Sequence, residues 1–157
     1  MNIIITKANT DDLPVIFDFT KKLNKDTNNK YDATVNVNFV ESKGGTSYLE
    51  QAVAKDDRIV FLAKCDGKAI GYILAVIEKV GDFRILNAQC EIDFLWVETD
   101  YRGRGVGTRL IQEVEKWCKD NNIKRLLITV DPHNKNALSL YKKELFVECD
   151  LTLGKDL

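Results

Sequence analysis

The order of apolar and polar positions predicts the first elements of the chain. Residues 2–7, NIIITK, are rich in β-branched side chains and predict a strand. Residues 9–24 repeat apolar side chains at helical spacing, and Thr10 or Asp11 is placed to cap that helix. Residues 24–45 are polar and weakly periodic, so we expect a loop with some extended structure there.

The middle of the chain predicts a short helix followed by strands. Residues 46–55 fit the helix, and two apolar runs, 58–65 and 69–80, come after it. The dipeptide Asp-Gly at positions 66–67 separates these runs, which is a strong signal for a β-hairpin. Residues 90–97, CEIDFLWV, predict a further strand directly before a glycine-rich segment.

The last part of the chain alternates helices with strands. Residues 106–121 gather apolar side chains on one helical face and are the clearest helix in the sequence. Residues 124–130 predict a strand, residues 134–145 a helix, and residues 146–157 one or two closing strands. The two late β-α-β connections imply parallel neighbouring strands. We therefore predict a single domain, residues 1–157, of the α/β (α+β) class with a mixed sheet.

Composition and charge narrow the function classes. The 157 residues are 45% hydrophobic and 30% charged, and 23 Lys and Arg nearly balance 24 Asp and Glu. This balance gives no basic field of the kind that binds nucleic acid, and no apolar run approaches the ~18 residues of a membrane span. The N-terminus lacks the basic start and cleavage site of a signal peptide. We therefore expect a cytoplasmic protein with no nucleic-acid or membrane partner.

The cysteines and the single histidine do not indicate a metal site. Cys65, Cys90, Cys118 and Cys149 lie far apart and form no C-x-x-C pair, and His133 is the only histidine. Zinc sites and disulfide frameworks need paired ligands, so we expect no metal and reduced thiols that are buried or half-buried. His133 follows a proline in a polar stretch, and we interpret it as a surface residue rather than a catalytic one.

The segment Tyr101–Gly107, YRGRGVG, joins a predicted strand to the clearest helix. The first N–H groups of a helix have no internal partner, and glycine removes the Cβ atoms that would keep an anion away from them. Arg102 and Arg104 add side-chain donors for phosphate oxygens. The spacing fits neither the P-loop nor G-x-G-x-x-G, because the sixth position from Gly103 is Thr108. A glycine-rich turn with solvated arginines is the alternative.

What is left, R-x-x-G-x-G between a strand and an amphipathic helix, resembles the acetyl-CoA-binding motif of the GNAT family of N-acetyltransferases. DGKAIGYI resembles the family's central hairpin, NKNALSLYKKELF its N-x-x-A-x-x-x-Y helix, and LTLGKDL its last strand. The resemblance is strong over residues 91–146 and weak over residues 24–55. It implies a mostly antiparallel mixed sheet, with a parallel pair splayed at the fourth and fifth strands, flanked by about four helices.

The resemblance also implies a function. It suggests an N-acetyltransferase that moves an acetyl group from acetyl-CoA, used as co-substrate without a metal, to a primary amine by direct attack in a ternary complex. The acceptor would be a small-molecule or peptide amine, and a homodimer is left open because similar proteins commonly dimerise. The alternative is an acyl-CoA-binding regulatory module on the same fold, without turnover.

The family pattern assigns candidate residues for acetyl-CoA. Backbone N–H groups of the glycine segment would hold the pyrophosphate, and the N–H of Val97 would polarise the thioester carbonyl. Asn134 matches the family asparagine that contacts CoA and is also placed to cap its helix, with Asn136 as runner-up. The full set of cofactor candidates is Leu95, Trp96, Val97, Arg102, Gly103, Arg104, Gly105, Val106, Gly107, Thr108, Asn134, Asn136 and Tyr141.

Three residues are candidates for proton transfer. The resemblance places Tyr141 beside the CoA sulfur, where a phenol can donate a proton to the leaving thiolate. Glu91 and Asp93 alternate with Ile92, so both point to one face of a mostly apolar strand, and a partly buried carboxylate is a stronger base. We rank Glu91 above Asp93. The alternatives are a tyrosine at the edge of the core and a solvated strand face.

One position departs from the family pattern. The family usually has glycine where this sequence has Leu145, before Phe146, and there the preceding helix ends in a left-handed residue. A non-glycine residue in that conformation costs roughly 1 kcal/mol. The departure leaves open how the helix ends and how the side chain of Tyr141 is aimed.

Overall fold

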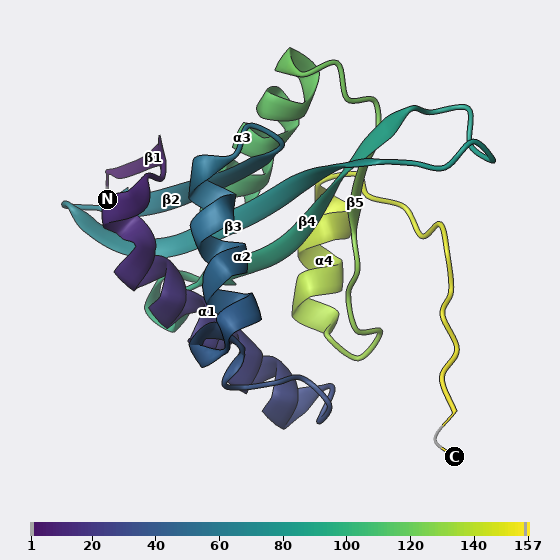
Figure 1. Cartoon of the computed structure of the whole chain (residues 1–157). Helices are drawn as coiled ribbons and strands as arrows, with labels where there is room; N and C mark the ends of the chain where they lie inside the picture. Colours follow the sequence, from purple (N-terminus) through teal and green to yellow (C-terminus); the bar gives the residue numbers. More distant parts are fainter. Residues whose placement is uncertain (1, 156) are drawn as a thin grey trace.

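The protein contains one five-stranded mixed sheet in the order β1-β2-β3-β4-β5 (Figure 1). The computed structural model describes residues 2–155 and residue 157. Each neighbouring pair among β1 to β4 is antiparallel, and β5 runs parallel to β4. The strands are β1 (Ile3–Lys7), β2 (Arg58–Cys65), β3 (Lys68–Lys79), β4 (Ala88–Val97) and β5 (Leu126–Ile128). The mostly antiparallel sheet implied by the resemblance is confirmed.

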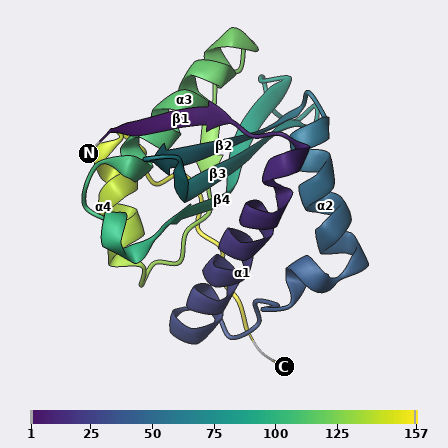
Figure 2. The same ribbon diagram turned by 90° about the vertical axis from the view of Figure 1, so that its left-hand side faces the viewer.

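Helices cover both faces of this sheet (Figure 2). They are α1 (Leu13–Lys30), α2 (Lys43–Ala54), α3 (Val106–Asp120) and α4 (Lys135–Lys143), with short 3-10 turns η1 (Thr10–Asp12), η2 (Phe39–Glu41) and η3 (Thr99–Tyr101). Helices α1 and α2 pack on one face around Phe19 and Tyr72, and α3 and α4 pack on the other around Ile73 and Leu110. The sheet therefore separates two hydrophobic cores. None of the described helices is long and apolar enough to cross a membrane.

Helix α1 differs from the prediction at both ends. Asn9 caps its η1 entry by accepting a hydrogen bond from the N–H of Asp11 at 2.8 Å, so the cap predicted at Thr10 or Asp11 is wrong. The helix also runs to Lys30, through a stretch predicted as loop. The polar second half of α1 binds the loop that follows it, since the side chain of Asn28 donates hydrogen bonds to two carbonyl groups of that loop. Because these contacts are made by polar side chains, a search for apolar periodicity in the sequence does not detect this half of the helix.

The β2–β3 hairpin forms at the predicted positions. Asp66 and Gly67 have φ angles of 49° and 80°. Positive φ at both central residues is what a two-residue type I′ turn requires. The hairpin places β3 in the centre of the sheet, where its other edge receives β4.

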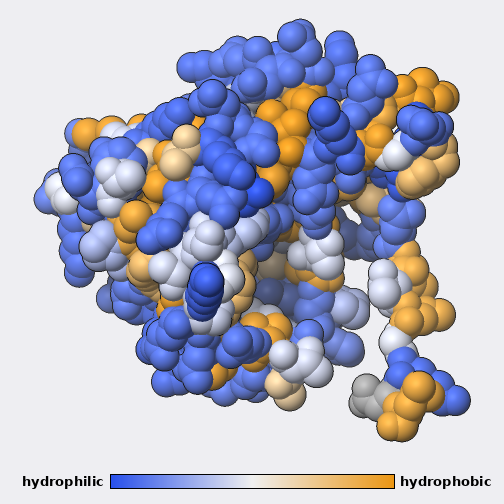
Figure 3. All heavy atoms as spheres, in the orientation of Figure 1, coloured by the Kyte–Doolittle hydropathy of each residue, from blue (hydrophilic) through white to orange (hydrophobic). Residues whose placement is uncertain are grey.

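The closing strands predicted for residues 146–157 are wrong for the described part of that segment. No described residue after α4 belongs to a strand, and the chain beyond Phe146 runs away from the body of the molecule (Figure 1). Val147, Leu151 and Leu153 expose 82%, 83% and 84% of their surface. Their alternation is typical of a strand, but a strand needs a neighbour for its hydrogen bonds. The outer edge of β5 is unpaired among the described residues, but this segment does not pair with it, and its hydrophobic surface stays exposed (Figure 3).

Candidate active site

Strands β4 and β5 separate after only three paired positions. Residues 90–92 of β4 pair with residues 126–128, and β4 then continues to Val97 with no partner on that side among the described residues. The register of β3 against β4 shifts at the same point, which leaves Asp93 as the extra residue of a β-bulge. The splayed parallel pair implied by the resemblance is therefore present.

The bulge changes which side chains face each core. Before it, Ile92 packs in the α3–α4 core. After it, Leu95 packs on that side, while Phe94 and Trp96 pack in the α1–α2 core. Asp93 reaches the same α1–α2 side, since it meets a side chain of α2. The bulge thus places a carboxylate next to an aromatic ring at the start of the opening.

The main chain of β4 faces the opening with free donors. The N–H of Glu98 donates to the carbonyl of Ile70 in β3 at 2.9 Å. Successive residues of a strand direct their N–H groups to opposite sides. The N–H of Val97, and that of Leu95 two residues earlier, therefore point to the side that β5 has left.

The glycine segment forms an open turn at the N-terminus of α3. Gly103 and Gly105 have φ angles of 72° and 79°, and a Cβ atom on either would meet no atom within 4 Å. The N–H groups of Gly103, Arg104 and Gly105 find no backbone acceptor among the described residues. Gly105 is the N-cap of α3 and brings no side chain to it. Free N–H groups therefore gather at the positive end of a helix dipole, which suits an anion.

Gly107 has a different role from the other two glycines. A Cβ atom on Gly107 would lie 3.0 Å from the side chain of Leu140, so glycine lets α4 approach the first turn of α3. The hydroxyl of Thr108 donates to Glu144 at 2.7 Å and ties the same two helices together. Helix α4, which carries Tyr141, is therefore docked beside the glycine turn.

The two arginines of the segment take different positions. The Nε of Arg102 donates to the carbonyl of Val97 at 2.8 Å, and its guanidinium lies 4.5 Å from the ring centre of Trp96. Trp96 is buried, and its Nε1 has no partner among the described residues. Val106 is buried in the α3–α4 core, and Arg104 is exposed. Arg102 therefore braces the turn against β4, while Arg104 extends from it.

Tyr141 is held by the C-terminal cap of α4. The N–H of Phe146 donates to the carbonyl of Tyr141 at 2.9 Å, and the N–H of Leu145 donates to that of Lys142 at 3.1 Å, which is a Schellman motif. Leu145 has a φ of 64°, so the left-handed helix end is confirmed despite the missing glycine. The ring of Phe146 packs 5.6 Å from that of Tyr141. Burial raises the pKa of Tyr141 to about 12, so the phenol stays protonated at neutral pH.

The polar residues at the start of α4 are on or near the surface. Asn134 accepts a hydrogen bond from the N–H of Ala137 at 3.1 Å, which confirms the helix-cap role. Asn136 is exposed on the first turn. His133 has an 84% exposed side chain and contacts Asp131 at 3.0 Å within its own loop. The interpretation of His133 as a surface residue is confirmed.

The two candidate bases have different neighbours. Glu91 lies where β4 and β5 are still paired, and it accepts a hydrogen bond from the hydroxyl of Thr129 at 3.1 Å. Asp93 lies at the bulge and accepts a hydrogen bond from the hydroxyl of Tyr48 on α2. Loss of hydration raises the pKa of Asp93 to about 6, although the side chain keeps contact with solvent. Asp93 can therefore exchange protons near neutral pH.

Tyr48 belongs to an aromatic cluster that the sequence pattern does not reveal. The rings of Phe39, Tyr48 and Phe94 lie 6.2 to 6.3 Å apart, centre to centre. A neighbouring pocket of about 170 Å³ lies between α1, the loop after it and β4. Its lining residues are Asn24, Val35, Asn36, Phe39 and Phe94. The three rings come from separate elements, so only the tertiary structure brings them together.

The described residues hold no group of His, Cys, Asp and Glu side chains arranged for a metal ion. Cys65, Cys90 and Cys118 are buried free thiols. Cys149 is exposed, so the prediction of a buried or half-buried thiol is wrong there, because the C-terminal segment that carries it does not pack on the body.

Comparisons with known proteins agree with this geometry. Residues 24–145 match the model of the acetyltransferase (GNAT) family. An uncharacterized N-acetyltransferase of Methanocaldococcus jannaschii is 25% identical over 116 residues, 74% of this chain and 51% of that protein. Streptothricin acetyltransferase A of Bacillus subtilis is 28% identical over 112 residues, 69% of this chain and 64% of that protein. The match thus spans between half and two thirds of these relatives.

A solved structure shares the fold across the whole chain. It is the aminoglycoside N-acetyltransferase AAC(6')-Iy in complex with the bisubstrate analogue CoA-S-monomethyl-acetylneamine. The TM-score is 0.78 over 100% of this chain and 99% of that chain, at 19% sequence identity. The likeness shows that the splayed sheet and its helices form a known architecture.

Proposed function

This chain belongs to the GNAT acetyltransferase family, and on that premise we propose that it is an N-acetyltransferase. It transfers the acetyl group of acetyl-CoA to a primary amine by direct attack within a ternary complex. The observation that carries the proposal is the opening between β4 and β5, which lies beside the glycine turn and α4. In this proposal the unpaired backbone donors of β4 and of the turn hold acetyl-CoA, and the protonated phenol of Tyr141 serves its thioester.

The glycine turn fits the pyrophosphate of CoA. Gly103 and Gly105 leave open space where a larger residue would place a side chain, and their N–H groups are unpaired among the described residues. The N-terminus of α3 adds the positive end of its dipole, and Arg104 adds an exposed cation. Arg102 contributes by holding the turn against Val97.

The unpaired edge of β4 fits the pantetheine arm. The N–H groups of Leu95 and Val97 point into the opening. An amide carbonyl group of the arm can accept from the N–H of Leu95, which leaves the N–H of Val97 for the thioester carbonyl. The main chain of Trp96 lies between these two donors. Asn134 and Asn136, at the start of α4, line the other side of the same opening in this proposal.

The chain's own residues then supply proton transfer and polarisation. Acetyl-CoA supplies a thioester carbonyl as electrophile. Asp93 accepts a proton from the acceptor's ammonium group, which frees the nitrogen lone pair. The N–H of Val97 donates to the carbonyl oxygen as negative charge develops there. As the C–N bond forms and the C–S bond breaks, Tyr141 donates its phenolic proton to the sulfur, and the second proton of the attacking nitrogen restores the phenol and leaves a neutral amide.

Geometry favours Asp93 over Glu91 as the base, which reverses the order suggested by the sequence. Asp93 lies at the bulge where the strands part, and its raised pKa of about 6 suits proton transfer near neutral pH. Glu91 lies one step back, where β5 is still paired, and is engaged by Thr129. Glu91 remains the second candidate.

The acceptor class is a small-molecule or peptide amine. The names of the matched proteins support this, since they include streptothricin and aminoglycoside acetyltransferases. The side chains of α1, α2 and the loop between them border the opening on the face opposite Tyr141. An acceptor entering there would meet the thioester from the other side of the sheet.

The test is a paired measurement of binding and turnover. Isothermal titration calorimetry measures acetyl-CoA binding, and a thiol reagent measures CoA release with a broad panel of primary amines. We expect binding together with amine-dependent thiol release. Binding without thiol release for every amine would favour a regulatory acyl-CoA-binding module, and no binding at all would contradict both functions.

A further inference from the structure

The pocket on the α1–α2 face has an apolar wall next to a carboxylate. Phe39 and Phe94 line the pocket, and their rings lie 6.2 Å apart. Phe94 directly follows Asp93, whose carboxylate is fixed by the hydroxyl of Tyr48. Tyr48 itself packs on both phenylalanines. The aromatic surface and the negative charge are therefore parts of one structure.

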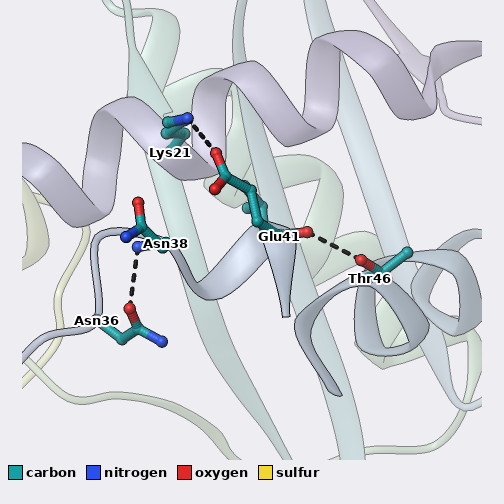
Figure 4. A network of polar contacts seen from close by, with 6 residues as sticks. Lys21, Asn36, Asn38, Glu41 and Thr46 are labelled. Atoms are coloured by element: carbon teal, nitrogen blue, oxygen red, sulfur yellow. Dashed lines mark hydrogen bonds and ion pairs between the residues drawn. The ribbon is translucent and has the colours of Figure 1, made fainter. Parts of the chain in front are cut away.

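Several other carboxylates of this face are paired with lysines. Lys21 pairs with Glu41, as Figure 4 shows. Lys22 bridges Asp18, at 2.8 Å, and Glu98 at the end of β4. Exposed pairs of this kind contribute little to stability, but they cancel the local charge. These pairs reduce the negative charge that this face offers to a molecule with many amino groups.

From these features we propose that the acceptor is a primary amine carried on one aromatic or apolar group, with a single positive charge. The inference rests on the proposed acetyltransferase function. The apolar body packs against Phe39 and Phe94, and the amino group lies beside Asp93. A polyamine or an aminoglycoside would set further charges and hydroxyl groups against the same apolar wall, where they lose hydration. The polar side chains of the lining, Asn24 and Asn36, are already hydrogen-bonded to main-chain groups.

An acceptor comparison tests the proposal. Amine-dependent thiol release is measured with 2-phenylethylamine, propylamine, spermidine and neamine at saturating acetyl-CoA. We expect kcat/KM for 2-phenylethylamine to exceed the other three by about tenfold or more, because ring burial adds binding that propylamine lacks. Higher kcat/KM for spermidine or neamine would overturn this inference and leave acetyl transfer intact. Thiol release with none of the amines, from protein that binds acetyl-CoA, would instead overturn the proposed function.

Two phenylalanine variants test whether the ring of Phe39 contributes to binding of the aromatic amine. Phe39→Ala removes one wall of the pocket and should lower kcat/KM for 2-phenylethylamine about tenfold, with little change for propylamine. Phe83→Ala is the matched control, because Phe83 is 84% exposed and outside the pocket. Equal losses for both amines in Phe39→Ala, at an unchanged melting temperature, would contradict the assigned role of the ring.

A charge variant tests the same pocket without removing a packed side chain. The side-chain oxygen of Asn36 accepts a hydrogen bond from the N–H of Asn38 at 3.0 Å (Figure 4). Asn36→Asp keeps that acceptor and adds one negative charge at the pocket. We expect kcat/KM for spermidine to rise several-fold relative to 2-phenylethylamine. No change in this ratio would count against the pocket as the acceptor site.

Discussion

At the scale of single residues, Tyr141 combines a fixed ring with a protonated hydroxyl. The ring is held by Phe146 and by the cap at Leu145, and burial raises the pKa of Tyr141 to about 12. Tyr141→Phe removes the proton donor and leaves the ring. We expect kcat to fall about 10²-fold, while calorimetry gives a Kd for acetyl-CoA within about twofold of wild type. Turnover at the wild-type rate would show that another group protonates the sulfur.

In the proposed mechanism, the protonation state of Asp93 determines how the rate falls at acid pH. Because its pKa is raised to about 6, the carboxylate is protonated below that pH and cannot accept a proton from the amine. We therefore expect kcat/KM to rise as pH increases through about 6, with a further rise where the free amine itself deprotonates. Asp93→Asn should lower the rate and remove the step near pH 6, as measured between pH 5 and 9. Persistence of that step in Asp93→Asn, with its loss in Glu91→Gln, would assign the base to Glu91.

The sequence is sufficient to predict the candidate residues, but it does not predict the contacts that they make. The motif predicts Gly103, Gly105 and Gly107 together, but only the structure separates two open turn positions from one that packs on Leu140. The motif predicts Arg102 as a phosphate ligand, but its side chain donates a hydrogen bond to the main chain of β4. The bond between Tyr48 and Asp93 joins residues 45 positions apart, and no local periodicity encodes it.

At the scale of elements, the conformation of the glycine turn before α3 explains why the proposed pyrophosphate site tolerates no side chain. Gly105 has a φ of 79°, which is strained for other residues, and the space beside it is open for a ligand. Gly105→Glu should abolish detectable acetyl-CoA binding in calorimetry, because its side chain fills the proposed pyrophosphate site and adds a negative charge beside the phosphates. Gly44→Ala is the control: Gly44 lies in α2 with open space around it, and binding should be unchanged. Retained affinity in Gly105→Glu would place the pyrophosphate elsewhere.

The end of α4 stores strain that can be relieved. Leu145 has a φ of 64° and is 86% exposed, so its side chain contributes little packing. Leu145→Gly should raise the free energy of unfolding by about 0.5–1 kcal/mol in urea titrations. Lys143→Gly, two residues earlier with helical geometry, should lower it by about 1 kcal/mol. A loss of stability in Leu145→Gly would mean that the leucine makes contacts that outweigh the strain.

Elements with strong local signals could be predicted, and those that depend on distant partners could not. The Asp-Gly hairpin and α3 form where the pattern places them. Helix α1 extends to Lys30 because its polar side chains bind the following loop, which apolar periodicity cannot indicate. Residues 147–155 have the alternation of a strand, but alternation does not decide whether a segment pairs with the free outer edge of β5, and among the described residues it does not.

At the scale of the whole molecule, the residues proposed for acetyl-CoA and those proposed for the amine lie on opposite faces of the sheet. Tyr141 and the glycine turn lie with α3 and α4, whereas Asp93 and the aromatic pocket lie with α1 and α2. The two sides meet where β4 and β5 part, so acetyl-CoA and the amine can occupy the site together. This arrangement favours direct transfer over a covalent acetyl-enzyme, since neither substrate must leave before the other binds.

Direct transfer is best tested by initial rates of CoA thiol release, measured while both acetyl-CoA and the amine are varied. We expect release that depends on the amine, is matched by acetylated amine in mass spectrometry, and gives intersecting lines in double-reciprocal plots. Parallel lines, the pattern of a covalent ping-pong enzyme, would contradict direct transfer. Saturable acetyl-CoA binding with no amine-dependent release would contradict catalysis altogether.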